Sequence, residues 1–116
     1  MTTHELSQMY WLRREIAQLE ENISRLTAEA EHEPDAELAA ERSEMLSSLK
    51  AKQFRCIREH KRIEEYIDSI SDSYLRQIVR YRFADGLSWQ QIANRFGNGV
   101  TASSLKKIYY RFAAKK

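Results

Sequence analysis

Residues 78–112 read IVRYRFADGLSWQQIANRFGNGVTASSLKKIYYRF, and this stretch decides the fold of the closing third of the chain. Ser88 has a side-chain oxygen suited to an N-cap, and Gln91 follows three residues later, so the pair predicts a capping box. We therefore expect a short helix over residues 89–96. The glycines and the asparagine at 97–99 are helix breakers and predict a tight turn.

A second helix is predicted from Ala102 to the tail, because Thr101 is a favourable N-cap. Apolar residues recur along it at spacings of three and four and share one face: Leu105, Ile108 and Phe112. The remaining surface is basic and aromatic: Lys106, Lys107, Tyr110 and Arg111. A short apolar helix, a tight turn and a helix with a cationic outer face match the helix-turn-helix plan, whose second helix enters the major groove of DNA.

A third helix is predicted to precede this pair, starting at Ser71 and Asp72 and ending at Ala84. Its apolar side chains fall on one side: Leu75, Ile78, Val79 and Phe83. Its cations fall on the other: Arg76, Arg80 and Arg82. We expect the apolar side to pack against a common core with Leu87, Trp89, Ile92, Phe96, Leu105, Ile108 and Phe112.

The segments RYRFADGLSWQQIANRFG and TASSLKKIYYRF resemble region 4 of sigma-70-type RNA polymerase factors, and more closely the small sigma-like regulators of phages and prophages. The resemblance covers about the last 45 residues. It implies that Ala93 is the small residue where the two helices approach, that Gly97 lies at the turn and that Leu105 is the aliphatic plug. The spacing from Ala93 to Leu105 is two residues longer than is usual in the family, with Asn98 and Gly99 as the simplest extra pair. Exact base contacts are therefore not transferred.

The helix-turn-helix interpretation assigns DNA contacts to two groups of residues. Those predicted near base edges or at the start of the reading helix are Thr101, Ser103, Ser104, Lys107 and Tyr110. Those predicted to hold phosphates are Arg95, Lys106, Arg111, Lys115 and Lys116. Trp89 and Tyr109 have the spacing of core residues, so we expect them to pack inside rather than stack on bases.

The charge distribution is uneven along the chain. Residues 1–70 hold 10 Lys+Arg against 15 Asp+Glu, a net charge of −5, whereas residues 71–116 hold 9 against 2, a net charge of +7. This asymmetry favours contact of the closing segment with a polyanion. The most acidic part is residues 1–44, with 4 Lys+Arg against 11 Asp+Glu.

The opening segment predicts two long helices. Thr2 and Glu5 form a capping box for a helix from Thr3 to Ala30, which would be ~40 Å long. Its apolar residues keep a heptad rhythm: Met9, Leu12, Ile16, Leu19, Ile23, Leu26 and Ala30. Pro34 suits a turn, and from Ala36 to Ser71 a second stripe follows the same rhythm: Leu46, Leu49, Gln53, Cys56, His60, Ile63, Ile67 and Ile70, with Leu38 and Met45 close to it. We expect an antiparallel helical hairpin with its tip near Pro34.

Two features of the hairpin bear on its partners. Gln53 and His60 interrupt the apolar stripe, either at its edge with one hydrogen bond to water or as register-setting residues in a larger assembly. Additional apolar residues exceed the needs of one two-stranded seam: Tyr10, Trp11, Leu46, Phe54 and Ile57. The hairpin therefore folds back on the DNA-binding unit or pairs with a second hairpin, and we favour the homodimer. A different protein is the remaining alternative.

The sequence thus predicts an all-α protein with a hairpin arm at residues 1–70 and a three-helix DNA-binding domain at residues 71–116. Gly and Pro are rare, at 3 and 1 residues, which does not suit a string of strands. Cys56 is the sole cysteine, and the histidines lack metal-ligand spacing. We expect no catalytic, cofactor or metal site. With no signal-peptide pattern and no apolar run of ~20 residues, we expect a cytoplasmic protein.

These observations favour a sequence-specific DNA-binding regulator of transcription that binds double-stranded DNA. The resemblance adds a phage or prophage origin and contact with RNA polymerase. One alternative is a phage-type inhibitor of a host polymerase or nuclease defence system, acting through the acidic hairpin. A DNA-packaging recognition subunit is a third, less favoured because its coil is expected after the helix-turn-helix and here precedes it. The operator and the choice between activation and repression are left open.

Overall fold

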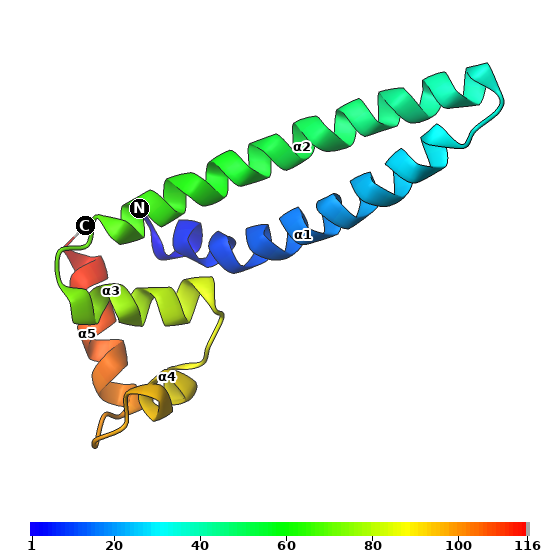
Figure 1. The fold of residues 1–116 in the computed structure, drawn as a ribbon. Helices are drawn as coiled ribbons and strands as arrows, with labels where there is room; N and C mark the ends of the chain where they lie inside the picture. The colour runs from blue at the N-terminus through cyan, green and yellow to red at the C-terminus, as the bar shows by residue number, and fades with distance from the viewer. Residues whose placement is uncertain (116) are drawn as a thin grey trace. The chain divides into compact units, whose positions relative to one another are not determined.

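A computed structural model describes residues 1–115 and is all-helical, with no strand in that range. Figure 1 shows the elements in chain order. They are α1 (Thr3–Glu31), α2 (Ala36–Asp68), α3 (Ser73–Val79), the π-helix η1 (Arg80–Ala84), α4 (Trp89–Phe96) and α5 (Ala102–Ala114). The predicted fold class is confirmed as all-α. The predicted phosphate contact Lys116 lies outside the described residues. None of the described helices is both long enough and apolar enough to cross a membrane.

Side-chain caps set the ends of the two long helices. The predicted capping box is present at the start of α1, where the Thr2 backbone N–H donates to Glu5 Oε1 over 3.2 Å and the Glu5 N–H donates to Thr2 Oγ1 over 3.1 Å. Asp35 Oδ1 accepts the backbone N–H of Glu37 over 2.9 Å and of Leu38 over 3.2 Å, which starts α2. Local hydrogen bonds therefore fix the first residues of both long helices.

The chain packs as two compact units. One, the head unit, consists of residues 1–11 together with 61–116, and the other, the paired-helix unit, of residues 12–60. The head unit thus includes the first turns of α1 and the last turns of α2, which the predicted division at residue 70 places in the arm. The reason is burial: Leu6 and Met9 are each 1% exposed, and they belong to the head unit with the fully buried Ile63 and Ile67.

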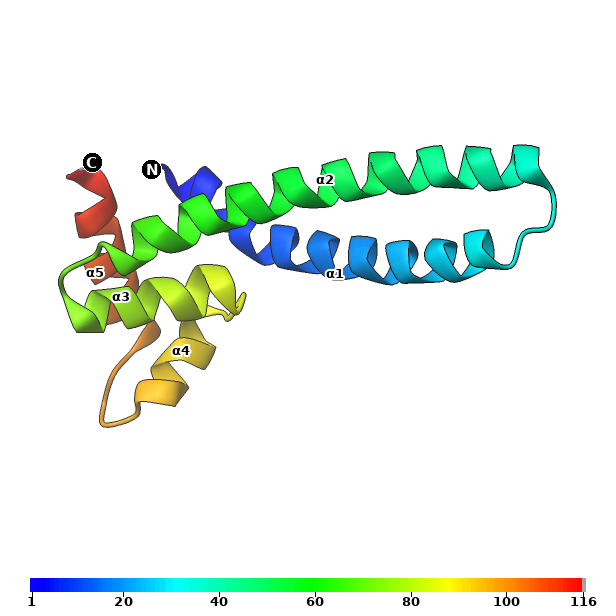
Figure 2. The same cartoon turned by 45° about the horizontal axis from the view of Figure 1, so that its top comes forward.

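The paired-helix unit holds the antiparallel middle parts of α1 and α2, which run side by side in Figures 1 and 2. Leu19, Leu26 and Cys56 are buried within it, and the polar residues Gln53 and His60 of the predicted stripe are half-buried. Leu38 and Met45, close to the predicted stripe, are not buried and remain 45% and 55% exposed.

Polar contacts also join the two helices of this unit. Arg42 donates through Nη1 to the backbone carbonyl of Glu29 over 3.0 Å, and the same nitrogen lies 3.3 Å from Glu33 Oε2. Lys52 Nζ lies 3.9 Å from Glu15 Oε1. The Lys52–Glu15 pair is exposed, and exposed ion pairs contribute little stability each.

The core of the head unit draws on every helix. Its buried residues are Leu6, Met9, Ile63, Ile67, Ile70, Ile78, Val79, Phe83, Ala84, Trp89, Ile92, Ala93, Leu105 and Tyr109. The first turn of α1 also makes polar contacts here: Arg62 donates to Glu5 Oε2 over 3.0 Å, and this hydrogen bond lowers the pKa of the Glu5 carboxyl. The closing helices are therefore not packed by residues 71–115 alone.

The helix after Asp72 departs from the prediction in one respect. Asp72 caps it as expected, with Oδ1 accepting from the N–H groups of Tyr74 and Leu75, but the regular helix ends at Val79. A π turn follows, with the Asp85 N–H donating to the carbonyl of Arg80 over 3.1 Å. A π turn holds one more residue than an α turn and so rotates the following side chains. The sequence carries no breaker at this position that would predict it.

Candidate nucleic-acid interface

The helix α4 begins and ends at the predicted residues. Ser88 Oγ accepts the Gln91 N–H over 3.1 Å, and Gln91 Oε1 accepts the Ser88 N–H over 2.8 Å, so the capping box is complete. Trp89 and Ile92 are buried, and Ala93 is 2% exposed. The small side chain at position 93 therefore lies in the core of the head unit.

Three consecutive residues of the turn between α4 and α5 have positive φ angles. The φ angles are 66° at Gly97, 50° at Asn98 and 78° at Gly99. A Cβ atom added at either glycine would have no neighbour within 4 Å. Glycine is thus required here by the backbone angle and not by space. Asn98 is the one non-glycine residue with positive φ in the described chain, and asparagine tolerates this region.

A second capping box starts α5. Thr101 Oγ1 accepts the Ser104 N–H over 3.1 Å, and Ser104 Oγ accepts the Thr101 N–H over 3.3 Å while lying 2.8 Å from the Thr101 carbonyl. The predicted DNA contacts Thr101 and Ser104 are therefore both engaged in holding the start of α5. Serine is an unusual partner in this box, and the sequence interpretation did not anticipate that role.

The buried face of α5 is centred on two residues. Leu105 is fully buried, as predicted, and Tyr109 is 1% exposed, whereas Ile108 and Phe112 are half-buried. The Tyr109 ring packs at centroid distances of 5.3 Å from Phe83 and 5.8 Å from Trp89. Burial raises the pKa of the Tyr109 hydroxyl. The expectation that Trp89 and Tyr109 are core residues is confirmed.

The opposite face of α5 is exposed and cationic. Its exposed side chains are Ser103, Ser104, Lys106, Lys107, Tyr110, Arg111 and Lys115. Ser103, Lys107 and Tyr110 are spaced by four and three residues, so they form one row along the helix. Tyr110 is 54% exposed, with its ring 6.4 Å from that of Trp89. The sequence of α5 contains no carboxylate. The structure thus brings most of the predicted DNA contacts onto one surface.

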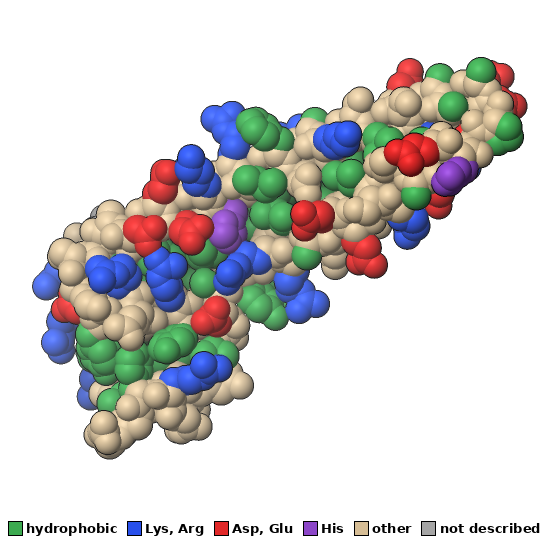
Figure 3. Space-filling model, in the orientation of Figure 1, with side chains coloured by type: hydrophobic (Ala, Val, Ile, Leu, Met, Phe, Trp, Pro, Cys, Tyr) green, Lys and Arg blue, Asp and Glu red, His purple; other side chains and the backbone are tan. Residues whose placement is uncertain are grey.

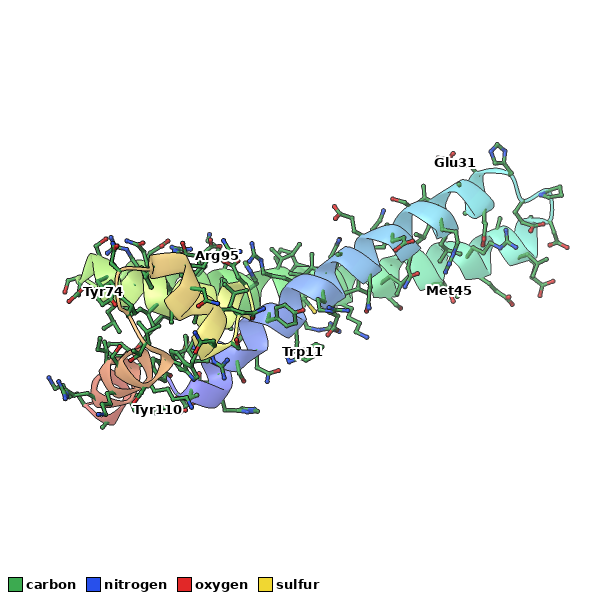
Figure 4. The ribbon with its side chains drawn as sticks, turned by 90° about the horizontal axis from the view of Figure 1, so that it is seen from below. Trp11, Glu31, Met45, Tyr74, Arg95 and Tyr110 are labelled. Carbon is green, nitrogen blue, oxygen red and sulfur yellow. The ribbon has the colours of Figure 1, made fainter. Side chains whose placement is uncertain are left out.

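Arg95 is the predicted contact that lies elsewhere. Its guanidinium carbon is 5.8 Å from the centroid of the Tyr81 ring. In Figure 4 the Arg95 side chain, on α4, and the Tyr110 side chain, on α5, lie toward different edges of the head unit. Arg95 also lines a polar groove of about 280 Å³ with Leu87, Gln91 and Asn94. The position of Arg95 relative to α5 could not be predicted from the sequence, because the orientation of α4 relative to α5 depends on the turn between them.

The remaining arginines of the head unit have structural partners. Arg76 donates to the Ile70 carbonyl over 2.6 Å, and Arg80 pairs with Asp68 and, over 3.9 Å, with Glu64. Arg82 donates to the Leu87 carbonyl over 3.0 Å and lies 4.9 Å above the Trp89 ring. The excess positive charge of the closing segment therefore divides into cations that hold the fold and cations exposed on α5.

Three aromatic side chains from α3, η1 and α4 form a cluster. The Phe96 ring meets those of Tyr74 and Tyr81 at centroid distances of 5.0 Å and 5.7 Å. Apolar side chains are visible in this part of the head unit in Figure 3. Tyr74 is 39% exposed. Phe96 itself is half-buried.

Other kinds of site find no support among residues 1–115. No group of three or more His, Cys, Asp or Glu side chains there could hold a metal ion. The buried thiol of Cys56 lies 3.6 Å from Glu15 Oε1, and burial followed by the Glu15 charge raises its pKa. A thiol of this kind is a poor nucleophile. Comparisons with protein-family models, curated proteins and solved structures give no significant match to this chain.

Proposed function

We propose that this protein is a sequence-specific DNA-binding regulator of transcription, without enzymatic activity, whose helix α5 enters the major groove. The observation that carries the proposal is the exposed face of α5, which is cationic, free of carboxylates and backed by a buried core. A rigid helix with a positive outer face is the element that major-groove recognition needs. The helices α4 and α5 then form the helix-turn-helix pair.

The exposed row on α5 divides between base and phosphate contacts. Ser103, Lys107 and Tyr110 lie on the row most remote from Leu105 and Tyr109, so they are the proposed base-reading residues. Lys106, Arg111 and Lys115 flank this row and are proposed to neutralise phosphates. Thr101 and Ser104 act chiefly as caps in this arrangement, and Arg95 is the weakest of the proposed contacts because it lies over Tyr81.

The antiparallel helices of residues 12–60 are proposed as a hairpin through which two copies associate. A homodimer presents two reading helices, and their two-fold relation matches a palindromic operator. The resemblance to sigma region 4 supports a phage or prophage origin and RNA polymerase as a further partner, and a regulator of this kind would act in the cytoplasm.

The test is a fluorescence-anisotropy titration of labelled duplex DNA at several salt concentrations. The intact protein should bind and weaken steeply with salt. The double variant Lys106→Ala/Lys107→Ala should reduce the slope of log K against log salt by about one to two units. The control is Lys50→Ala/Lys61→Ala, which removes the same charge from exposed positions on α2. A control that flattens the slope as much as the α5 variant, or an intact protein that ignores DNA at low salt, would refute the proposal.

A second candidate function rests on the acidic segment around the turn between α1 and α2. Residues 29–44 hold seven carboxylates against one cation, Arg42, which is already paired with Glu33. All of these carboxylates except Glu33 are exposed. Such a surface is suited to a basic site on a host polymerase or nuclease, where it would act as a DNA-like competitor. Inhibition of such an enzyme by the intact chain, abolished by Glu37→Gln/Glu41→Gln, is the result that would favour this function.

A further inference from the structure

A shallow groove runs between the two helices of the paired-helix unit. Its volume is about 340 Å³, and it is lined by Arg13, Ile16, Ala17 and Glu20 of α1 and by Ile57 and His60 of α2. Ile57 is 44% exposed, and Phe54, one turn earlier on α2, is 60% exposed. Exposed apolar side chains grouped in this way, one in a groove and one a turn away on the same helix, are typical of an interaction surface.

The four α1 residues that line this groove carry a positive charge at one end and a negative charge at the other. Arg13, Ile16, Ala17 and Glu20 lie at positions i, i+3, i+4 and i+7, so they share one face of the helix. When the helix direction is reversed, Glu20 takes the place of Arg13, and Ala17 takes the place of Ile16. A two-fold axis perpendicular to α1, between residues 16 and 17, would bring each Arg13 opposite the Glu20 of another copy.

We propose that this groove is the dimer interface and that its occupant is α1 of a second copy, antiparallel and centred between Ile16 and Ala17. The two-fold axis makes two identical oppositely charged contacts, Arg13 with the partner's Glu20 and Glu20 with the partner's Arg13. A parallel arrangement would set like charges against each other at both positions. The chemistry of the groove is thus complementary to itself, which is the requirement of a two-fold interface.

The side chains at the centre of the groove suit close packing of two helices. Ile16 meets the partner's Ala17, and Ala17 has too little bulk to hold the helices apart at the usual interaxial distance of ~8 to 10 Å. The exposed Ile57 then packs at the flank of the second α1, which removes its apolar surface from water. A four-helix arrangement results from two paired-helix units.

A second groove in the same unit lacks this property. It has a volume of about 540 Å³ and is lined by Asn22, Arg25, Leu26, Glu29, Met45 and Leu49. Its α1 residues Asn22, Arg25, Leu26 and Glu29 have the same spacing, but reversing the helix about their centre places the charged Arg25 opposite Leu26 and the Asn22 amide opposite Glu29. This groove provides the comparison surface for the test.

The inference rests on the homodimer of the proposed function and specifies its surface and orientation. Sedimentation equilibrium of the full chain should give a dimer for the intact protein. Arg13→Glu and Glu20→Arg should each raise the dimer dissociation constant at least ~tenfold, because each replaces two attractive contacts with two repulsive ones. An equimolar mixture of the two variants should recover a heterodimer, and the double variant R13E/E20R should recover a homodimer.

The matched controls are Arg25→Glu and Glu29→Arg, which make the same charge changes at the second groove. They should leave the dissociation constant within about threefold of the intact protein. Recovery by mixing also shows that the single variants are folded. A monomeric intact protein, single variants that remain dimers, or variants that do not recover on mixing would each overturn the assignment.

Anisotropy titrations on the same samples separate this inference from the proposed function. An intact monomer that binds DNA with the expected salt dependence would overturn the dimer interface and leave DNA binding standing. A dimer that responds to the charge exchange as expected but ignores DNA would support the interface and refute the DNA-binding proposal.

Discussion

The hydroxyl of Tyr109 lies 2.7 Å from the hydroxyl of Thr3, 106 residues earlier in the chain. The bond joins the first turn of α1 to the middle of α5 within the head unit. The ring of Tyr109 packs against Phe83 and Trp89 and so holds α5 in the core. The start of the chain therefore helps to position the helix that is proposed to read DNA. Removal of this hydrogen bond should therefore lower the free energy of unfolding.

Tyr109→Phe tests this bond. The variant keeps the ring and loses the hydroxyl, so we expect the free energy of unfolding in urea to fall by about 1 kcal/mol. Tyr110→Phe is the matched control and should change it by less than ~0.5 kcal/mol, because that ring is 54% exposed. Equal unfolding curves for the intact protein and Tyr109→Phe would show that the bond to Thr3 adds no stability.

Gly86→Ala tests the packing of α1 against the turn before α4. Gly86 has φ of +70°, and an added Cβ would lie 2.7 Å from Tyr10 Cδ2. Gly97 has φ of +66° and ψ of −156° with open space around it, so Gly97→Ala measures a backbone cost alone, of about 1 to 3 kcal/mol. We expect Gly86→Ala to be clearly more destabilising in thermal unfolding than Gly97→Ala.

The excess cost of Gly86→Ala should disappear in a Tyr10→Ala background, since the ring is then absent. This double-mutant comparison isolates the contact from the backbone strain. If the excess persists without the ring, the approach of Tyr10 to Gly86 is not its cause.

Leu105→Ala should cost ~2 to 5 kcal/mol of unfolding free energy, because the side chain is fully buried and its loss leaves a cavity. DNA binding should be lost through unfolding and return at low temperature where the variant is folded. Lys106→Ala, at the adjacent exposed position, should leave the melting temperature nearly unchanged. An unaltered melting temperature for Leu105→Ala would contradict the assignment of the faces of α5.

Cys56 should react slowly with thiol reagents near neutral pH, because burial and the neighbouring Glu15 raise the pKa of its thiol. Glu15→Gln removes the repulsive charge, so the alkylation rate of the folded protein should increase. Glu21→Gln, on the same helix, is the control and should have no effect. A rate for the intact protein equal to that in denaturant would show that the thiol is not protected.

The same shift makes a prediction for stability against pH. A thiol whose pKa is higher in the folded state than in the unfolded chain stabilises the fold fully below the unfolded pKa. That contribution is lost as the pH rises through the folded pKa. The difference in unfolding free energy between the intact protein and Cys56→Ser should therefore shrink at alkaline pH, as urea titrations at a series of pH values would show.

Residues close in the chain determined where α1, α4 and α5 begin. The capping boxes of Thr2 with Glu5 and of Ser88 with Gln91 are complete within four residues, so they could be read without the fold. The apolar rhythm likewise indicated which side of α5 is buried, and thus which cations are exposed. Both features depend on geometry within one or two helical turns, and the all-α class follows from them.

Tertiary packing decided the relationships between distant residues. Periodicity could not rank Tyr109 above Ile108 and Phe112, because that ranking depends on Phe83, Trp89 and Thr3 meeting one ring. Nor could it place Arg95 against Tyr81. A helix pattern specifies the directions of side chains around one axis, whereas the distance between two helices depends on turn angles and core volume summed over the whole unit. For this protein, the local sequence therefore determined the helices and their cationic face, and only the tertiary structure decided that residues 1–11 help to hold them.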